Sequence, residues 1–204
     1  ILMDESAWFE MTPEPIAVHI AERINSTGIK IKRVVDGTAG VGGNLVHFAQ
    51  RIKFQGEVNV VGFDIVPDKL TKARHNARIY DVPDESIKLY YHDFIQFARK
   101  QEYDPETVVF LSPPWGGPEC FNAPSFGMRE VVIDPYGYDF IVDLCDVALR
   151  ITPHVILYMP RNQDLDDLAA YCASRGITEF EVEKICFTHP ELHVKCLCIY
   201  LSRE

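Results

Sequence analysis

Apolar runs rich in β-branched and aromatic residues alternate with helical patterns along almost the whole chain. Such alternation is typical of an α/β protein, in which parallel strands are joined by crossover helices. The expected strands are 32–36, 58–64, 87–93, 108–111, 154–158, 178–186 and 194–201. The expected helices begin at the N-cap Thr12, at Asn44 and at Pro67, and two more span 141–149 and 165–172. Only the last two strands are expected to form a hairpin.

Composition limits what kind of molecule this can be. The chain has 204 residues and 47% hydrophobic content, which suits one buried core. It has neither a run of eighteen apolar residues nor a signal peptide, so we expect a soluble intracellular protein without a membrane partner. A net charge of −10 argues against a long contact with nucleic acid and favours engagement at one point. Because the sequence opens without methionine, we expect further protein outside it.

Two cysteines close in sequence, Cys196 and Cys198, stand in the last expected strand. Strand periodicity points both side chains to one face, but no Cys-x-x-Cys pair occurs. We therefore expect buried free thiols in a reducing compartment rather than zinc ligands or a disulfide, and no metal site.

A glycine-rich turn at residues 37–43 follows the first expected strand. Glycines there let the backbone approach a ligand and let the next helix pack closely. Leu45 stands where a dinucleotide fingerprint requires its third glycine, so a nicotinamide cofactor is not expected. An oxidoreductase would also need a proton-transfer residue, for which His47 and His92 lack supporting spacing. For the turn taken alone, the alternative is a purely structural tight turn.

Three carboxylates stand at the ends of the first three strands, where α/β proteins bind ligands. Asp64 can accept hydrogen bonds from two ribose hydroxyls, Asp93 can reach an adenine amine, and Asp36 can attract an ammonium group. Together they describe an adenosyl cofactor that carries an amino acid tail. Singly, each carboxylate could instead cap a helix.

The segment Ser112-Pro113-Pro114-Trp115 follows the fourth expected strand directly. Prolines continue a sheet poorly, so a purpose other than packing is expected. The Ser112 hydroxyl and the Pro113 carbonyl can accept the two hydrogens of an aromatic amine and turn its lone pair toward a methyl donor. Trp115 can stack on the base and favour a cationic ring, although a core or loop-anchoring tryptophan is the alternative.

These residues carry a family resemblance. The runs from Asp36 to Asn44 and from Ser112 to Pro118 resemble the trimethylguanosine synthase family of RNA cap methyltransferases. The similarity runs nearly end to end, and it includes the short motifs Trp8-Phe9, Thr12-Pro13-Glu14, Gly62-Phe63-Asp64, His92-Asp93-Phe94 and Met159-Pro160-Arg161-Asn162.

The resemblance implies a class I S-adenosylmethionine-dependent methyltransferase: a Rossmann-like α/β fold with a mostly parallel seven-stranded sheet, an antiparallel last hairpin and an N-terminal helical extension. Residues 1–30 would form the extension and first helix, packing on a methyltransferase domain at 31–204. The implied catalytic residues are Ser112, Pro113 and Trp115. Trp115, Arg161 and Asn162 would bind the capped substrate. The implied cofactor residues are Phe9, Thr12, Asp36, Thr38, Gly40, Gly42, Asn44, Asp64, Asp93 and Phe94.

The implied reaction is two methyl transfers to the 7-methylguanosine cap of small nuclear and nucleolar RNAs, in the nucleus and nucleolus with a cytoplasmic pool. RNA-protein particle proteins would be partners through regions outside this sequence. The alternatives are an amino methyltransferase for adenine in nucleic acid or for protein glutamine, and an inactive cap-binding module.

The sequence departs from the family at two positions. Leu2 and Cys120 stand where some members carry a basic residue and a tyrosine. Phe121 is a candidate to replace the aromatic ring. Arg51, Lys53 and Arg129 are candidates to replace the charge, although solvated surface is the simpler reading for them.

Overall fold

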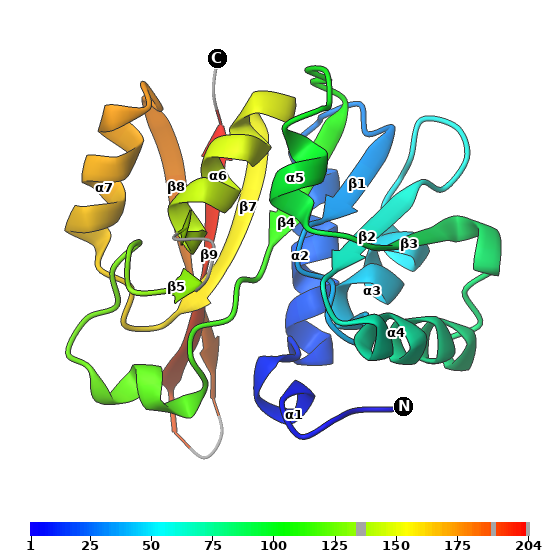
Figure 1. Cartoon of the computed structure of the whole chain (residues 1–204), viewed down its shortest axis with the longest axis horizontal. Helices are drawn as coiled ribbons and strands as arrows, with labels where there is room; N and C mark the ends of the chain where they lie inside the picture. Colours follow the sequence, from blue (N-terminus) through cyan, green and yellow to red (C-terminus); the bar gives the residue numbers. More distant parts are fainter. Residues whose placement is uncertain (134–137, 189–190, 203–204) are drawn as a thin grey trace.

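A seven-stranded sheet forms the centre of the computed structural model, with the strand order β3-β2-β1-β4-β7-β9-β8 (Figure 1). The structure describes residues 1–133, 138–188 and 191–202. Strand β9 runs antiparallel to β7 and β8, whereas the other neighbours pair in parallel. The strands of this sheet are β1 (Arg33–Asp36), β2 (Val60–Asp64), β3 (Ile87–Tyr91), β4 (Thr107–Leu111), β7 (His154–Pro160), β8 (Glu179–Phe187) and β9 (His193–Ser202). The expected mixed sheet with its antiparallel last hairpin is thus confirmed.

Helices cover both faces of this sheet. The α-helices are α1 (Ala7–Glu10), α2 (Glu14–Ser26), α3 (Gly43–Arg51), α4 (Pro67–Ile79), α5 (Phe94–Ala98), α6 (Phe140–Ile151) and α7 (Leu165–Ser174). The turns η1 (Asp84–Ser86) and η2 (Pro118–Asn122) are 3-10 helices. Buried residues of α2, α3 and α4 form one core cluster with the sheet, and those of α5, α6 and α7 form another. Among the described residues, no helix is long and apolar enough to cross a membrane.

Strand β4 shows why the two clusters form. Val108 and Phe110 point into the cluster with α2 and α3, whereas Val109 and Leu111 point into the cluster with α5 and α6. Since side chains alternate along a strand, a continuous apolar run fills both faces. The expectation of a strand buried on both sides is confirmed here.

Strand β1 lies between β2 and β4, so the chain winds outward to β3 and then returns across β1. The loops that follow β1 and β4 therefore diverge at the carboxyl ends of these two strands, which opens a crevice at this switch point. One hydrogen bond ties the two loops together, from the Ser112 amide to Thr38 Oγ1 at 2.7 Å. The glycine turn and the proline segment thus meet where ligands bind in this class of fold.

Several local predictions were wrong. Helix α2 begins at Glu14 with Pro13 as its N-cap, because the Thr12 hydroxyl is engaged by Asn44 instead of capping the helix. The short strands β5 (Val132–Ile133) and β6 (Tyr138–Asp139) pair antiparallel, so the last hairpin is not the only antiparallel pair. Helices α1 and α5 were not expected as separate elements, since four or five residues leave little periodicity.

The first thirty residues share the sheet's core. Ile16, Ile20 and Ile24 of α2 belong to the same buried cluster as Val34 and Phe48. A division of the chain at residue 30 remains a prediction. Cys196 and Cys198 are both buried in this cluster as free thiols, which confirms that they face the same side of the sheet.

Candidate active site

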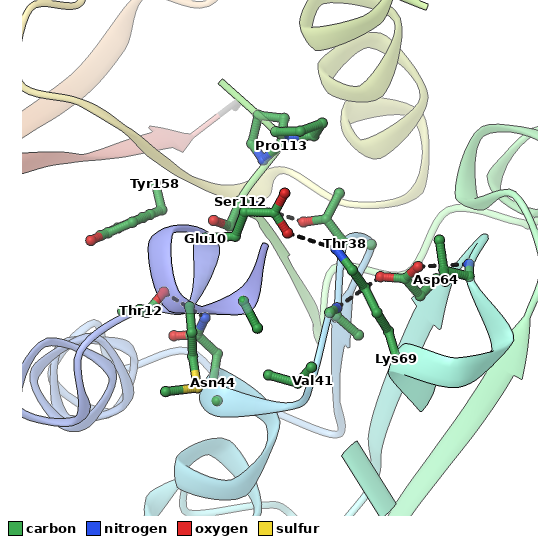
Figure 2. Close-up of a pocket in the computed structure, with 18 of the residues that line it drawn as sticks. Glu10, Thr12, Thr38, Val41, Asn44, Asp64, Lys69, Ser112, Pro113 and Tyr158 are labelled. Atoms are coloured by element: carbon green, nitrogen blue, oxygen red, sulfur yellow. Dashed lines mark hydrogen bonds and ion pairs between the residues drawn. The ribbon is translucent and has the colours of Figure 1, made fainter. Parts of the chain in front are cut away.

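A cavity of about 900 Å³ opens at the carboxyl ends of β1, β2, β3 and β4. We call one part of its wall the cofactor side, made of α1, residues 37–41, Gly43, Asn44, Asp64 and residues 91–94. The opposite part is the acceptor side, made of Ser112–Trp115, Phe121, Tyr158 and Lys195. Figure 2 shows Asp64 and Lys69 on one side of Ser112 and Tyr158 on the other. This volume lies in the range of small-molecule sites.

Close packing shapes the glycine turn on the cofactor side. A Cβ at Gly37 would lie 2.6 Å from the Leu111 side chain and 2.8 Å from the Phe94 ring, so a larger residue would force these buried side chains to move. Gly42 has a φ of 88°, and its Cβ would lie 2.9 Å from that of Ala73 on α4. Gly42 does not line the cavity, so its predicted cofactor contact is replaced by helix packing. Thr38, Gly40 and Asn44, which were also predicted to contact the cofactor, line the cavity.

Asp64 holds the glycine turn and faces the cavity. Its carboxylate accepts from the Gly40 amide at 2.9 Å and from the Val66 amide at 2.8 Å. Burial raises its pKa above the ordinary value, while these two hydrogen bonds oppose that shift. A pair of hydroxyls donating to this carboxylate would favour its charged form.

Asp36 lies behind the cavity wall. It is 1% exposed, accepts from the Thr38 amide at 3.0 Å and does not line the cavity. Burial raises its pKa to about 7. The direct contact with an ammonium group predicted for Asp36 does not fit this geometry, because the Asp36 carboxyl group is buried and does not line the cavity.

Asp93 both caps α5 and lines the cavity. Its carboxylate accepts from the Ile95 amide at 2.8 Å, which is the helix-capping alternative. The next residue, Phe94, is buried and also lines the cavity. Capping and ligand contact are thus compatible here, since one carboxylate can accept several hydrogen bonds.

The segment before α2 closes the cofactor side. The Asn44 amide nitrogen donates to Thr12 Oγ1 at 2.9 Å, and Glu10 on α1 pairs with Lys69 on α4 at 2.6 Å (Figure 2). Trp8 and Phe9 line the cavity, although they are 73% and 63% exposed. The sequence pattern did not signal the Glu10–Lys69 pair, because the partners lie 59 positions apart.

The acceptor side is built around Trp115. Its indole Nε1 donates to the Tyr158 carbonyl at 3.3 Å, and its ring stacks on the Tyr158 ring with centroids 5.3 Å apart. Phe121 meets it edge-on, with centroids 6.3 Å apart. Pro113 is buried and Ser112 half-buried, and both line the cavity. The four residues singled out from the sequence, Ser112, Pro113, Trp115 and Phe121, thus converge. Tyr158 was missed because it comes from the distant strand β7.

Two predicted substrate residues do not line the cavity. Asn162 donates to the carbonyls of Cys120 at 2.9 Å and Ala123 at 3.1 Å, so it holds the η2 segment rather than assisting Arg161. Arg161 is exposed, with its guanidinium 4.5 Å from the centroid of the Phe121 ring. Arg161 therefore lies beside a residue of the cavity wall without forming part of it.

Of the candidates to replace family residues, Phe121 lines the cavity, which supports its aromatic role. Arg129 pairs with Asp139 and Arg51 with Glu22, and neither lines the cavity. Lys53 lies outside it as well. The simpler reading of these three cations as surface residues fits the structure.

Comparison with known proteins decides the family. Residues 31–204 match the family described as RNA cap guanine-N2 methyltransferase. The chain belongs to this family. It is 30% identical over 209 residues to the trimethylguanosine synthase of Schizosaccharomyces pombe, covering all of this chain and 79% of the relative.

A second relative of this methyltransferase is the trimethylguanosine synthase of Saccharomyces cerevisiae, 32% identical over 174 residues that cover 83% of the chain and 51% of the relative. In structure, the chain resembles an S-adenosylmethionine-dependent O-methyltransferase from Thermotoga maritima with a TM-score of 0.59 at 15% identity, over 96% of this chain and 68% of the other. The fold is that of class I methyltransferases. The chain is thus an S-adenosylmethionine-dependent enzyme that methylates N2 of the guanine in RNA caps.

The cofactor side fits S-adenosylmethionine. Asn44 Oδ1 is buried without a hydrogen-bond partner among the described residues, and Asn44 lines the cavity. An ammonium group would supply the missing donor, while Asp64 would hold the ribose hydroxyls. When bound, the cofactor supplies an electrophilic methyl group on a sulfonium sulfur. The protein's part is to hold the guanine amine in line with that methyl group.

Proposed function

We propose that this methyltransferase adds two methyl groups in turn to the exocyclic amine of a 7-methylguanosine cap, giving 2,2,7-trimethylguanosine. The observation that carries the proposal is the position of Ser112-Pro113-Pro114-Trp115. This segment leaves β4 beside the glycine turn, to which the Ser112 amide is hydrogen-bonded, and its residues line the shared cavity.

Ser112 and Pro113 orient the amine. The lone pair of a guanine amine is delocalised into the ring, so it is a poor nucleophile in the plane of the base. The Ser112 hydroxyl and Pro113 carbonyl accept its two hydrogens and turn the lone pair out of that plane. The bound cofactor would supply the methyl carbon, which would bond to the nitrogen as the carbon-sulfur bond breaks, and the proton released from nitrogen would pass to solvent. After the first transfer one hydrogen remains, which suffices to repeat this orientation.

Trp115 selects the methylated base. One face of its ring is covered by Tyr158, which leaves the cavity side for the substrate. A 7-methylguanine ring is cationic, and an aromatic face attracts a cation by about 0.5 to 2 kcal/mol beyond ordinary contact. This preference supports action after methylation at N7.

The RNA substrates and the location belong to the same proposal. We propose that its substrates are the caps of small nuclear and nucleolar RNAs. The proposed location is the nucleus and nucleolus, with a cytoplasmic pool. We expect RNA-protein particle proteins to bind parts of the protein beyond this sequence. The names of the two trimethylguanosine synthase relatives support the product. A net charge of −10 supports contact with the cap rather than with a long stretch of RNA.

The test is methyl transfer to isolated nucleotides. Purified protein is mixed with labelled S-adenosylmethionine and with 7-methylguanosine diphosphate, guanosine diphosphate or adenosine diphosphate, and products are identified by mass. We expect one and then two added methyl groups on 7-methylguanosine diphosphate alone. Equal transfer to guanosine diphosphate would contradict the proposed selection of the methylated base by Trp115. Transfer to the adenine nucleotide would show that the substrate is adenine and not 7-methylguanine.

A further inference from the structure

Thr38 joins the two sides of the cavity. Its backbone belongs to the glycine turn of the cofactor side, where its amide donates to the Asp36 carboxyl group at 3.0 Å. Its hydroxyl oxygen accepts from the amide of Ser112, the first residue of the acceptor side, at 2.7 Å (Figure 2). One side chain thus connects the turn that faces the cofactor with the residue that orients the guanine amine.

This hydrogen bond fixes the start of the proline segment. The turn is itself docked on β4, because the Gly37 amide donates to the Phe110 carbonyl at 3.0 Å. The two residues after Ser112 are prolines, which have no amide hydrogen and a fixed φ. The Ser112 amide is therefore the last N–H that can anchor the segment before Trp115. Its bond to Thr38 sets the direction in which this rigid segment leaves β4.

The Thr38 hydroxyl also has a hydrogen to give. It donates to no acceptor within residues 1–133, 138–188 and 191–202, and Thr38 lines the cavity. A hydroxyl can accept and donate at the same time, and bonds in such a chain strengthen one another by polarisation. A ligand atom that accepts from Thr38 would therefore fix the hydroxyl and tighten its hold on the Ser112 amide.

The carboxylate of S-adenosylmethionine is the acceptor that fits. The amino acid tail of the cofactor carries an ammonium group, which suits the unpartnered Oδ1 of Asn44, and a carboxylate on the same carbon atom. Asn44 ends the turn that contains Thr38, and both residues line the cavity. Burial raises the pKa of Asp36 to about 7, so at lower pH Asp36 is protonated and does not repel a second carboxyl group.

We propose that Thr38 is a positioning residue that couples the two binding steps: its hydroxyl donates to the carboxylate of the cofactor and holds Ser112 in place for the guanine amine. The inference rests on the proposed function for the identity of the acceptor. The acceptor should bind more tightly when the tail is bound, and by linkage the cofactor should bind more tightly by the same factor when the acceptor is bound. For one hydrogen bond this factor is about three- to ten-fold.

Hydrogen exchange of the Ser112 amide, followed by NMR, tests the cofactor half of the link. Exchange is measured in the free protein, with saturating S-adenosylhomocysteine, and with saturating 5'-methylthioadenosine, which lacks the amino acid tail. S-adenosylhomocysteine should slow exchange of this amide about three- to ten-fold, and 5'-methylthioadenosine should leave it unchanged. Equal slowing by both ligands, or slowing by neither, would overturn the role of the tail.

Substitutions at Thr38 test the acceptor half. Thr38→Val removes the hydroxyl and keeps a β-branched side chain, whereas Thr38→Ser keeps the hydroxyl. In the wild type and in Thr38→Ser, S-adenosylhomocysteine should lower the Kd for 7-methylguanosine diphosphate about three- to ten-fold, as measured by quenching of tryptophan fluorescence. In Thr38→Val this Kd should not depend on S-adenosylhomocysteine, and kcat for methyl transfer should fall about ten-fold.

Thr178→Val is the matched control, because Thr178 is an exposed threonine next to β8 that does not line the cavity. It makes the same chemical change and should leave both the coupling and kcat as in the wild type. Coupling that persists in Thr38→Val would overturn the inference, as would its loss in Thr38→Ser.

The exchange measurement needs no acceptor, which separates this inference from the proposed function. If the wild type transfers no methyl group to 7-methylguanosine diphosphate, the proposed function fails. Exchange of the Ser112 amide that S-adenosylhomocysteine slows in the wild type but not in Thr38→Val would still support the link. The same response in both proteins would overturn it.

Discussion

The two sides of the cavity are built in different ways. The cofactor side is made of short loops at the ends of strands, where carboxyl groups such as those of Asp36 and Asp64 hold backbone amides. A Cβ added at Gly37, Gly42 or Gly43 would lie within 3 Å of a neighbouring side chain. The acceptor side depends on side chains brought from β4, β7, η2 and β9, and its central contact is a stack of Trp115 on Tyr158. Cofactor binding and base recognition should therefore respond to different substitutions.

Ser112→Ala should have the largest effect on catalysis. It removes one of the two acceptors that orient the amine but leaves the backbone bond from the Ser112 amide to Thr38 in place. By analogy with the loss of one preorganised hydrogen-bonding group, kcat should fall about 100- to 1000-fold. Titration calorimetry should give an unchanged Kd for S-adenosylmethionine. A comparable loss of cofactor affinity would show that the two sides are not separate.

Asp36→Asn should change how stability depends on pH. The pKa of Asp36 is raised from 3.8 to about 7 in the folded chain, so folding favours its protonated form. The wild type should then lose stability as pH rises from about 4 to about 7, by about 2 to 4 kcal/mol at about 1.4 kcal/mol per unit of pKa shift. The variant should lack this loss.

Urea unfolding of both proteins at pH 5 and pH 8 measures the difference. The free energy of unfolding of Asp36→Asn relative to the wild type should increase with pH. An identical pH dependence in the two proteins would contradict the buried, protonated Asp36.

Asp64→Asn should weaken cofactor binding without touching the acceptor side. It removes the charge that ribose hydroxyls would meet but keeps an oxygen for the Gly40 amide. The Kd for S-adenosylmethionine should rise about 10- to 100-fold. Asp81→Asn is the control, because Asp81 is exposed and its φ of 56° is a conformation that asparagine tolerates.

Breaking the Glu10–Lys69 pair should have the smallest effect. The pair is partly exposed, with side-chain exposures of 41% for Glu10 and 17% for Lys69, so it is worth about 0.2 to 1 kcal/mol. Glu10→Gln should raise the Kd for the cofactor about two- to five-fold at low salt and less at high salt. Exchanging the two residues, Glu10→Lys with Lys69→Glu, should recover part of the affinity; no recovery would mean that α1 is held by other contacts.

The same contrast explains what could be predicted from sequence. Strands β1 and β2 end in Asp36 and Asp64, and β4 is followed by Ser112, each directly after an apolar run. The convergence of these residues follows from the rules of parallel sheets. Tyr158 and Lys195 carry no such signal, because they reach the cavity through the antiparallel pairing of β7 with β9.

The hydrogen-bond partners of some side chains also could not be predicted from the sequence. Thr12 reads as a helix cap, but its hydroxyl meets Asn44, which lies 32 positions away. Asn162 reads as a companion of Arg161, but its amide meets the carbonyls of η2 and the following residue. In both cases a tertiary partner competes with the local one, and only the folded chain brings that partner within reach.

The most direct test of the two-sided site is Trp115→Leu, which keeps an apolar side chain against Tyr158 but removes the aromatic face. We would measure the Kd for S-adenosylmethionine and the KM for 7-methylguanosine triphosphate and guanosine triphosphate in the same preparation. The KM for the methylated nucleotide should rise about ten-fold or more and the preference for it should disappear, while the Kd for the cofactor stays within about two-fold of the wild type. A retained preference for the methylated nucleotide, or a parallel loss of cofactor affinity, would contradict the account.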